Sequence, residues 1–323
     1  MMKAVCINEV TPGEKIALSH IPIPKVKPGW VLIKIKAFGL NHSEKILRHL
    51  EIKESYIKHP IIPGIECVGE IIDSSDTQFK PYTKVVALMG GMGRSFDGSY
   101  AEYALLPIHH VFEIKFDLEK NNLTWEKIAS IPETYFTAWG SLFECLDIKK
   151  EDILLIRGAT CALGYAAINI AKAFGCKKII ATTHKENKKN LLKNADEIII
   201  DEGKLENKIE KVNKVLELIG PKTLLDSLKC CDKKGIVCQT GILGGLEEIN
   251  KFDPIKDIPN GVYLTGFFSN YPTQEIIDKI FGFIIENKID INIGKVYNFS
   301  NIKEAIIAQD NHSVDGKIVV TLN

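Results

Sequence analysis

The second half of the chain alternates short apolar segments with helical stretches, and this alternation restricts the possible folds more than any other feature of the sequence. Segments rich in Ile, Val and Leu, each typical of a buried β-strand, lie at residues 152–157, 178–182, 197–201, 214–218, 235–240 and 262–266. Strands that alternate with helices form a parallel sheet with helices on both faces. Residues 124–290 are therefore predicted to form a doubly wound α/β domain of the nucleotide-binding type.

The first part of the chain has a different pattern. Its apolar segments are short and rich in Val and Ile, as in VLIKIKA at residues 31–37, and residues typical of turns separate them. We expect a β-rich barrel or sandwich in residues 1–123, with the boundary near Leu123. A strand-rich pattern returns at residues 291–323, which we expect to complete this first domain.

Composition limits the class of partner. The 323 residues exceed the usual size of one domain, and a cleft between two domains is a common ligand site. The 41 basic and 41 acidic residues cancel, which argues against nucleic acid or an anionic membrane as the main partner. The first residues contain no apolar run that resembles a signal peptide or a membrane span. We therefore expect a cytoplasmic protein that binds a small-molecule substrate.

The cysteines indicate reduced thiols. The chain has eight cysteines with no CxxC pair and no repeated spacing. Structural zinc sites use clustered cysteines, so this pattern does not predict one.

A candidate dinucleotide-binding loop follows the first strand of the predicted sheet. The segment DILLIR (152–157) runs into a loop at 158–164 and then into a helical stretch at 165–174. Such a turn directs backbone N–H groups and the helix dipole at a pyrophosphate. The motif is degenerate, because Ala159 and Cys161 occupy the first two glycine positions of GxGxxG. An ordinary strand-to-helix turn is the alternative interpretation.

The end of the second predicted strand favours NADPH as the cofactor. The adenosine ribose of a bound dinucleotide lies at this strand end, where NAD-binding proteins usually carry Asp or Glu. This chain has hydroxyl and basic side chains there instead, at Thr182, Thr183, His184, Lys185, Lys188 and Lys189. These groups suit a 2′-phosphate. Glu186 keeps NADH open as the less favoured cofactor, and a solvated basic turn is the alternative.

Several segments together match one protein family. They are IPIPKVKPGWVLIKIKAFGLNHSE, PIIPGIECVGEI, DGSYAEY, IPETYFTAWGSL, RGATCALGYAAINIAKAFG, IIATTHKENK, CQTGILGG and the closing GKIVV. The chain resembles the medium-chain dehydrogenase/reductase superfamily and, within it, the zinc-free quinone oxidoreductase branch that includes zeta-crystallin. This resemblance implies a GroES-like catalytic domain joined to a Rossmann NADP(H)-binding domain, assembled as a homodimer or homotetramer.

The resemblance also implies that the chain uses no zinc. Zinc-dependent members carry a cysteine in the first of these segments and a histidine in a GHE motif. Here Asn41 stands at the cysteine position, and the GHE motif is Gly64-Ile65-Glu66. Isoleucine cannot coordinate a metal, and an amide oxygen is a poor zinc ligand. The four-cysteine segment that holds structural zinc is replaced by MGGMGRSFDGSYAEY.

A reductase without a Lewis acid needs an acceptor that spreads the incoming charge. An isolated ketone develops an alkoxide that little in such a site would stabilise. Quinones and α,β-unsaturated carbonyl compounds are conjugated, so positioning and one or two hydrogen-bond donors suffice. We therefore predict NADPH-dependent transfer of a hydride to a quinone or an enone.

The resemblance assigns candidate residues to this chemistry. Asn41 is expected near the nicotinamide, with His42 and Ser43 in the same loop. Arg94 is suggested by its own sequence context, because the glycines of GGMGRSFDGSY permit a flexible loop near the cleft, where the guanidinium can hydrogen-bond a substrate oxygen. The expected catalytic residues are Asn41, His42 and Arg94. The other expected cofactor-binding residues are Thr137, Gly158, Ala159, Thr160, Ala162, Leu163, Gly164, Thr182, Thr183, His184, Lys188, Gln239, Thr240, Gly241, Phe267 and Phe268.

Each of these assignments has a structural alternative. His42 can be a packing histidine, Arg94 an exposed loop residue, and the two phenylalanines core residues. Two other functions also stay open. One is reduction of an enoyl thioester, and the other is a non-catalytic NADPH-binding sensor or structural protein.

Overall fold

The structure is a computed structural model that describes residues 1–246 and 248–322. Its internal contacts divide the chain into two compact units, which are described separately below. The first unit comprises Met1–Glu133, Asn270–Glu286 and Ile291–Asn323, and the second comprises Thr134–Ser269 and Asn287–Asp290. The two architectures expected from the sequence, one β-rich and one with a doubly wound parallel sheet, are confirmed. The predicted boundaries at 123/124 and 290/291 stay predictions.

The second unit is built on a six-stranded parallel sheet with the order β10-β9-β8-β11-β12-β13. The strands are β8 (Ile153–Arg157), β9 (Lys178–Thr183), β10 (Glu197–Ile200), β11 (Val212–Glu217), β12 (Cys231–Gln239) and β13 (Tyr263–Gly266). All six predicted strands are thereby confirmed. The order reverses between β8 and β11, and open α/β sheets bind ligands outside the carboxyl ends of their strands at such a reversal.

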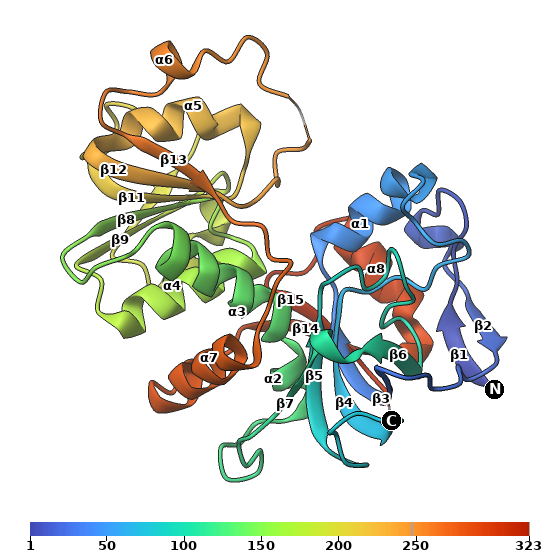
Figure 1. The fold of residues 1–323 in the computed structure, drawn as a ribbon. Helices are drawn as coiled ribbons and strands as arrows, with labels where there is room; N and C mark the ends of the chain where they lie inside the picture. Colours follow the sequence, from blue (N-terminus) through green and yellow to red (C-terminus); the bar gives the residue numbers. More distant parts are fainter. Residues whose placement is uncertain (247, 323) are drawn as a thin grey trace. The chain divides into compact units, whose positions relative to one another are not determined.

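Helices cover both faces of this sheet, as the strand–helix alternation predicts. In Figure 1, α4 (Ala162–Phe174) and α5 (Pro221–Cys230) lie on opposite faces. Helix α4 begins at Ala162, earlier than the predicted residue 165, so the last three residues of the glycine loop belong to its first turn. The unit also contains most of α3 (Pro132–Trp139), a π-helical segment (Gly140–Cys145), a 3₁₀ segment (Glu186–Leu192) and α6 (Pro254–Asp257).

The first unit is built on a largely antiparallel seven-stranded sheet with the order β14-β15-β3-β4-β5-β7, in which β6 also pairs with β3. Its strands are β3 (Trp30–Gly39), β4 (Glu66–Asp73), β5 (Lys84–Leu88), β6 (Tyr103–Pro107), β7 (Val111–Glu113), β14 (Ile293–Asn298) and β15 (Lys317–Thr321). A separate pair consists of β1 (Met2–Val5) and β2 (Leu18–Ile21). Because β15 pairs with β3, the end of the chain completes the sheet formed by its beginning.

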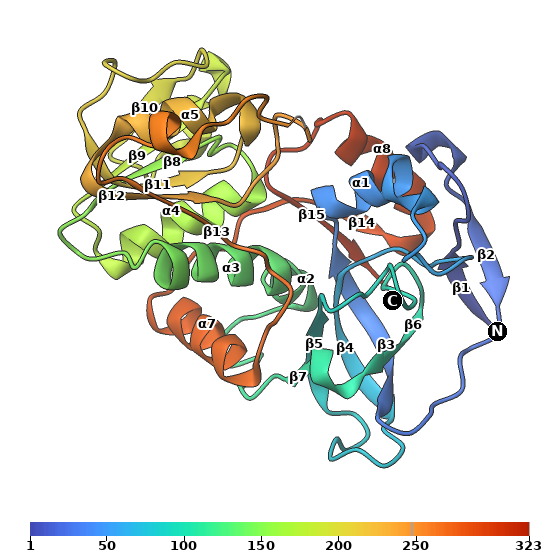
Figure 2. The same cartoon turned by 45° about the horizontal axis from the view of Figure 1, so that its top comes forward.

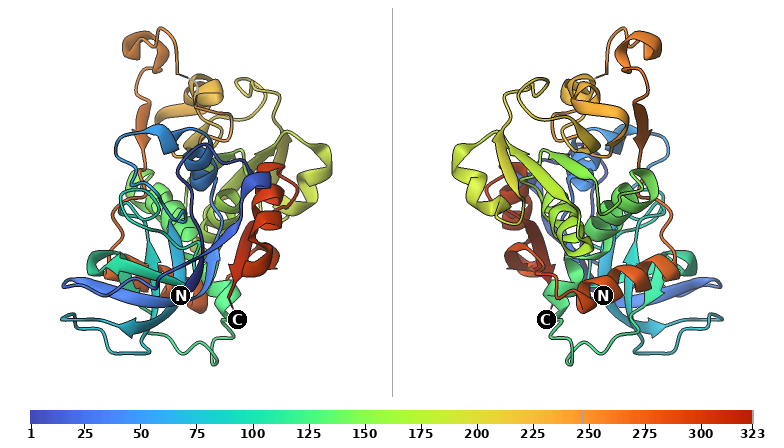
Figure 3. Two further views of the ribbon diagram at one scale, coloured as in Figure 1. Left: turned by 90° about the vertical axis from the view of Figure 1, so that its right-hand side faces the viewer. Right: turned by 90° about the vertical axis from the view of Figure 1, so that its left-hand side faces the viewer.

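Helices from both ends of the chain pack together in this unit. Its helices are α1 (His42–His49), α2 (Trp125–Ala129), α7 (Gln274–Glu286) and α8 (Ile302–Asp310). Figures 1 and 2 show α1 beside α8, and Arg48 Nη2 on α1 lies 2.6 Å from Asp310 Oδ1 on α8. Figure 3 shows the C-terminal helix from two further sides, with the N-terminal segment alongside it. Gly13 of that segment has Ile306 and Ile307 of α8 among its nearest neighbours.

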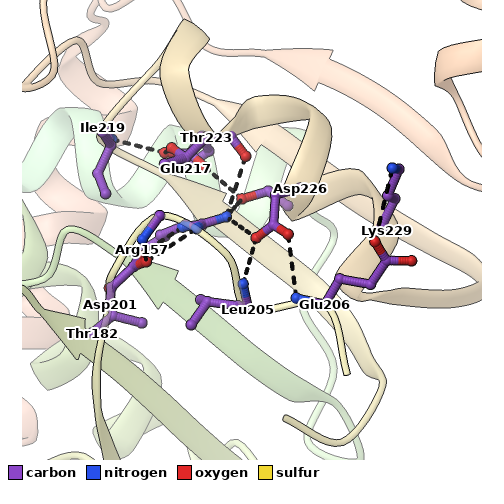
Figure 4. A network of polar contacts seen from close by, with 12 residues as sticks. Arg157, Thr182, Asp201, Leu205, Glu206, Glu217, Ile219, Thr223, Asp226 and Lys229 are labelled. Carbon is purple, nitrogen blue, oxygen red and sulfur yellow. Dashed lines mark hydrogen bonds and ion pairs between the residues drawn. The ribbon is translucent and has the colours of Figure 1, made fainter. Parts of the chain in front are cut away.

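A buried ionic network joins the carboxyl ends of neighbouring strands in the second unit (Figure 4). Arg157, the last residue of β8, is fully buried. Its Nε lies 2.7 Å from Asp201 Oδ2, just after β10, and its Nη1 lies 2.7 Å from Asp226 Oδ2 on α5. Thr182 Oγ1 on β9 donates to the same Asp201 oxygen over 3.5 Å. A cation held in this way connects β8, β9, β10 and α5 just below the glycine loop.

Glu217, at the end of β11, caps the start of α5 beside this network. Its Oε1 accepts hydrogen bonds from the Ile219 N–H (2.8 Å), the Gly220 N–H (3.1 Å) and Thr223 Oγ1 (3.0 Å). Burial raises the pKa of Glu217 despite these donors and the nearby Arg157. The strand end and the helix start are therefore joined through one buried carboxyl group.

Replacing Arg157 with Met is expected to lower the free energy of unfolding by about 3–5 kcal/mol, because the buried Asp201 and the half-buried Asp226 would lose their cation. Urea unfolding followed by circular dichroism measures the change. The matched control is Lys172→Met, which removes an exposed ion pair with Asp196 and should change stability by less than about 1 kcal/mol. Equal losses in the two variants would contradict a structural role for the buried network.

Candidate active site

The glycine loop of the second unit has the geometry that a close-approaching ligand requires. Gly158 has a φ of +80°, and a Cβ there would lie 2.9 Å from Ile219 Cγ1. A Cβ at Gly164 would lie 2.2 Å from the Ala159 carbonyl oxygen, so only glycine lets α4 start this close to the strand. The N–H groups of Ala162 and Leu163 open α4 and have no partner inside the helix. The loop thus offers helix N-terminal amides suited to an anion.

The hydroxyls at the end of β9 are used within the protein. Thr182 is fully buried, and its Oγ1 accepts a hydrogen bond from the Gly158 N–H over 3.0 Å. Thr183 is 2 % exposed, and its Oγ1 accepts from the Lys185 N–H over 3.2 Å. In this turn His184, Lys185 and Glu186 are exposed, and Lys188 and Lys189 are half-buried. The surface of the turn therefore carries cations together with the Glu186 carboxylate, whereas the two threonines are buried.

Other expected cofactor residues of the second unit lie near one another. Thr137 on α3 is buried, and its carbonyl oxygen accepts from Ser141 Oγ over 2.7 Å. Ser141 Oγ also lies 2.9 Å from Thr240 Oγ1, which follows β12. Thr137 and the segment from Gln239 to Gly241 are in this way connected through one serine.

The two phenylalanines after β13 differ in their surroundings. The ring of Phe267 packs edge-on against Phe136 at 5.7 Å and fills the space where a Cβ of Gly140 would lie. Phe268 is 75 % exposed. Phe267 is therefore a packing residue in this structure, whereas Phe268 presents its ring to the surroundings.

In the first unit, Asn41 belongs to a group of four residues that we call the buried polar cluster: Asn41, Glu44, Glu66 and Lys317. All four are at most 7 % exposed. Asn41 Oδ1 accepts from Lys317 Nζ over 2.5 Å, and Asn41 Nδ2 donates to Glu66 Oε1 over 2.9 Å. Lys317 Nζ lies 2.7 Å from the same Glu66 oxygen. The Asn41 amide is therefore bound on both sides by charged groups.

Glu44 completes the buried polar cluster at the start of α1. Its Oε2 accepts from the Asn41 N–H over 2.6 Å, as the third residue of a capping box does, and its Oε1 accepts from the Ile65 N–H over 3.1 Å. Burial raises the pKa of Glu44 to about 7, and Lys317 opposes this shift. Glu44 therefore changes its charge close to neutral pH.

His42 and Arg94, the other expected catalytic residues, lie around the same helix start. Burial lowers the pKa of His42, with Lys45 and His312 acting in the same direction, so its imidazole is neutral at pH 7. Arg94 Nη2 lies 2.7 Å from Glu51 Oε2 and donates to Ser43 Oγ over 2.8 Å. The Arg94 guanidinium is thus paired within the protein. A substrate that bound to it would do so while Glu51 remained its other partner.

The sequence analysis did not single out Lys317, Glu44 or Arg157 as site residues. Each had a signal in the sequence. Lys317 and Arg157 are charged residues at the ends of apolar strands, and Glu44 stands three residues after Asn41, the spacing of a capping box. A charge at the end of an apolar strand indicates a buried ion pair only if its partner is known, and the partners here lie far away in the chain.

Two implied groups fit these residues differently. A dinucleotide fits the glycine loop, because the glycines leave space and the first amides of α4 face it. Zinc does not fit the cluster, because the Asn41 amide oxygen and a Glu66 carboxylate oxygen already bind the Lys317 ammonium ion. Both Glu44 oxygens accept backbone N–H groups, and residue 65 has an aliphatic side chain. Within residues 1–246 and 248–322, no group of three or more His, Cys, Asp or Glu side chains is arranged to hold a metal ion.

Two family models match the chain. The one described as "Alcohol dehydrogenase GroES-like domain" matches residues 27–116, and the one described as "Zinc-binding dehydrogenase" matches residues 162–284. The human "Quinone oxidoreductase" is 28% identical over 284 residues, which cover 83% of this chain and 82% of the human protein. None of the helices that the structure describes has the length and apolar character needed to cross a bilayer.

Solved structures share the fold at low identity. Mycobacterial Rv1454c complexed with NADPH aligns with a TM-score of 0.84 at 21% identity, over 99% of this chain and 100% of that one. The Bacillus subtilis protein yhfP with NAD bound aligns with a TM-score of 0.83 at 21% identity, over 99% of both chains. These likenesses establish the fold, in agreement with the doubly wound sheet and the β-rich unit.

The contribution of Glu44 to the free energy of unfolding is expected to fall as pH rises from about 4.5 to about 7. The folded-state pKa of Glu44 is raised from 4.5 to about 7, so the folded protein keeps a proton that the unfolded chain has lost. The retained proton contributes about 3 kcal/mol to the free energy of unfolding at low pH. This contribution is lost progressively between pH 4.5 and 7 and is absent above pH 7. Urea unfolding at pH 5, 6, 7 and 8 should show a steeper decline in the wild type than in Glu44→Gln, and identical slopes would contradict the shift.

Proposed function

This chain belongs to the medium-chain dehydrogenase/reductase superfamily, and from that premise we propose that it reduces quinones or α,β-unsaturated carbonyl compounds with NADPH and without zinc. It is an oxidoreductase of that family. The observation that carries the finer proposal is the donor set around Asn41. Its amide is hydrogen-bonded to an ammonium ion and a carboxylate, so it offers no vacant metal ligand.

The acceptor follows from this donor set. A site without a Lewis acid must rely on positioning and hydrogen bonds, which suffice when conjugation in the acceptor spreads the developing charge. The neutral imidazole of His42 can donate or accept a hydrogen bond, and Arg94 supplies a cation on the same loop surface. The similarity to the human quinone oxidoreductase favours quinones within this class. We propose His42 and Arg94 as the residues that face the acceptor, with Asn41 behind them.

The cofactor preference follows from the turn after β9. When bound, NADPH supplies the hydride. The glycine loop is proposed to hold the pyrophosphate on the first amides of α4, and His184 and Lys188 to bind the adenosine phosphate. Thr137, the segment from Gln239 to Gly241 and Phe268 are proposed to lie along the nicotinamide half. The fold relatives include both an NADPH and an NAD complex, so the preference rests on the basic turn.

Assembly and location complete the proposal. We propose a homodimer or homotetramer in the cytoplasm, acting on a small molecule. Size-exclusion chromatography with light scattering tests the first part, and imaging of the tagged full chain tests the second.

The metal-stripped protein is expected to oxidise NADPH with 1,4-benzoquinone, 9,10-phenanthrenequinone or a simple enone, and 1,10-phenanthroline should leave the rate unchanged. Initial rates at 340 nm measure this. Loss of turnover on chelation, with recovery on adding Zn²⁺, would sink the zinc-independent mechanism. NADPH binding without turnover of any acceptor would instead favour a sensor or structural role.

Replacing Lys188 with Glu is expected to raise the KM for NADPH about tenfold or more, because a charge-assisted contact to the phosphate is lost and a repulsion is added. The KM for NADH should change less than twofold. The matched control is Lys193→Glu, an equal charge change at an exposed position just after the same segment. A similar rise in both KM values, or the same effect in the control, would count against a phosphate site at this turn.

A further inference from the structure

We propose that Lys317 is a resident cation of the candidate active site, whose ammonium group holds the Asn41 amide in place. This inference deepens the proposed function and rests on it. Lys317 acts as a positioning residue. In this scheme the Asn41 amide orients the start of α1. His42 and Ser43, which follow it, are the residues of this segment that a ligand can contact.

The geometry around Lys317 is that of a compact cation site. Its Nζ lies 2.5 Å from Asn41 Oδ1 and 2.7 Å from Glu66 Oε1. Asn41 directly precedes α1 and Glu66 begins β4, so the ammonium ion joins two segments that are separate in the chain. A second cation at this place would meet a positive charge already present, which disfavours metal binding.

The hydrogen-bonding capacity of the Asn41 amide supports a positioning role. The nitrogen has two N–H donors, and they are directed to Glu66 Oε1 at 2.9 Å and Glu44 Oε1 at 3.4 Å. The oxygen accepts from Lys317. An amide bound in this way has no remaining N–H for a developing oxyanion, so its contribution is to hold the backbone from which His42 projects.

The main chain around the ion pair is built to accommodate it. A Cβ at Gly39 on β3 would lie 2.3 Å from Lys317 Cε and 2.4 Å from Glu66 Oε1. Glu66 Oε2 also accepts from the Glu133 N–H over 2.8 Å, and Gln309 Nε2 donates to the Asn41 carbonyl oxygen over 2.8 Å. Four separate segments of the first unit therefore converge on Asn41 and Glu66.

The charge of Lys317 is maintained by its neighbours. Burial lowers the pKa of Lys317, but Glu66, Glu133 and Glu44 outweigh this effect and raise the pKa above its ordinary value. The ammonium form therefore persists across the pH range in which the enzyme would act. In this low-dielectric setting a fixed charge beside an amide orients it strongly.

The test compares Lys317→Met with Lys317→Arg, and uses Lys303→Met on the exposed face of α8 as the matched control. Amide hydrogen exchange is read by mass spectrometry in peptides covering residues 39–47 and 131–136, which contain the N–H groups of Asn41 and Glu133. We expect faster exchange in both peptides for Lys317→Met, partial recovery in Lys317→Arg and no change in the control. Unchanged exchange in Lys317→Met would overturn the proposal.

Kinetics distinguish positioning from general stability. In Lys317→Met we expect kcat with a quinone to fall about 100-fold, as when a reacting geometry is displaced, while the dissociation constant for NADPH stays within twofold. If the wild type reduces no acceptor, the proposed function fails, and hydrogen exchange still decides the role of Lys317. Turnover in folded Lys317→Met equal to that of the wild type would overturn that role.

A second variant guards against misfolding. Lys317→Met leaves Glu66 buried without its cation, whereas Lys317→Met/Glu66→Gln removes both charges and is expected to fold. This double variant should show the same fast exchange near Asn41 and the same loss of kcat. A folded double variant with wild-type exchange and wild-type kcat would overturn the proposal.

Discussion

Each unit of this protein contains a fully buried cation, and a charge removed from water must be paired where it lies. Arg157 is held by Asp201 and Asp226, and Lys317 by Glu66. An unpaired ion in such a place would cost several kcal/mol. The backbone segments that carry these acidic partners are therefore brought to the end of β8, next to Arg157, and to the start of β15, next to Lys317. Residues proposed for function lie beside both places.

In the second unit this pairing acts just below the glycine loop. Arg157 directly precedes Gly158, and Thr182 contacts both the Gly158 N–H and Asp201. The carboxyl ends of neighbouring strands are thus fixed relative to one another before any ligand arrives. A preformed loop is what a dinucleotide site requires, because ordering it on binding would subtract from the affinity. The ionic network and the glycine geometry are two parts of the same local construction.

In the first unit, the need to pair a buried cation affects the part of the proposed site that would contact the acceptor. Lys317 enters at the start of the last strand, and β15 is placed beside β3 by its antiparallel pairing. The ammonium then meets the amide at the start of α1. This arrangement gives a physical reason why a member of a family with zinc-binding relatives could act on conjugated acceptors alone. The fixed charge of Lys317 orients the Asn41 amide and is not available to polarise a substrate oxygen.

The sequence by itself determined the class of fold and the position of the glycine loop after β8, because strand and helix periodicity and a glycine-containing turn are local properties of the chain. All six strands of the parallel sheet were predicted from it. The domain boundaries, the cofactor preference and the site residues stay predictions. Only the tertiary structure decided that Thr182 is buried, that Phe267 packs on Phe136, and that Lys317 meets Asn41. Those outcomes depend on pairing between residues far apart in the chain, which no local pattern records.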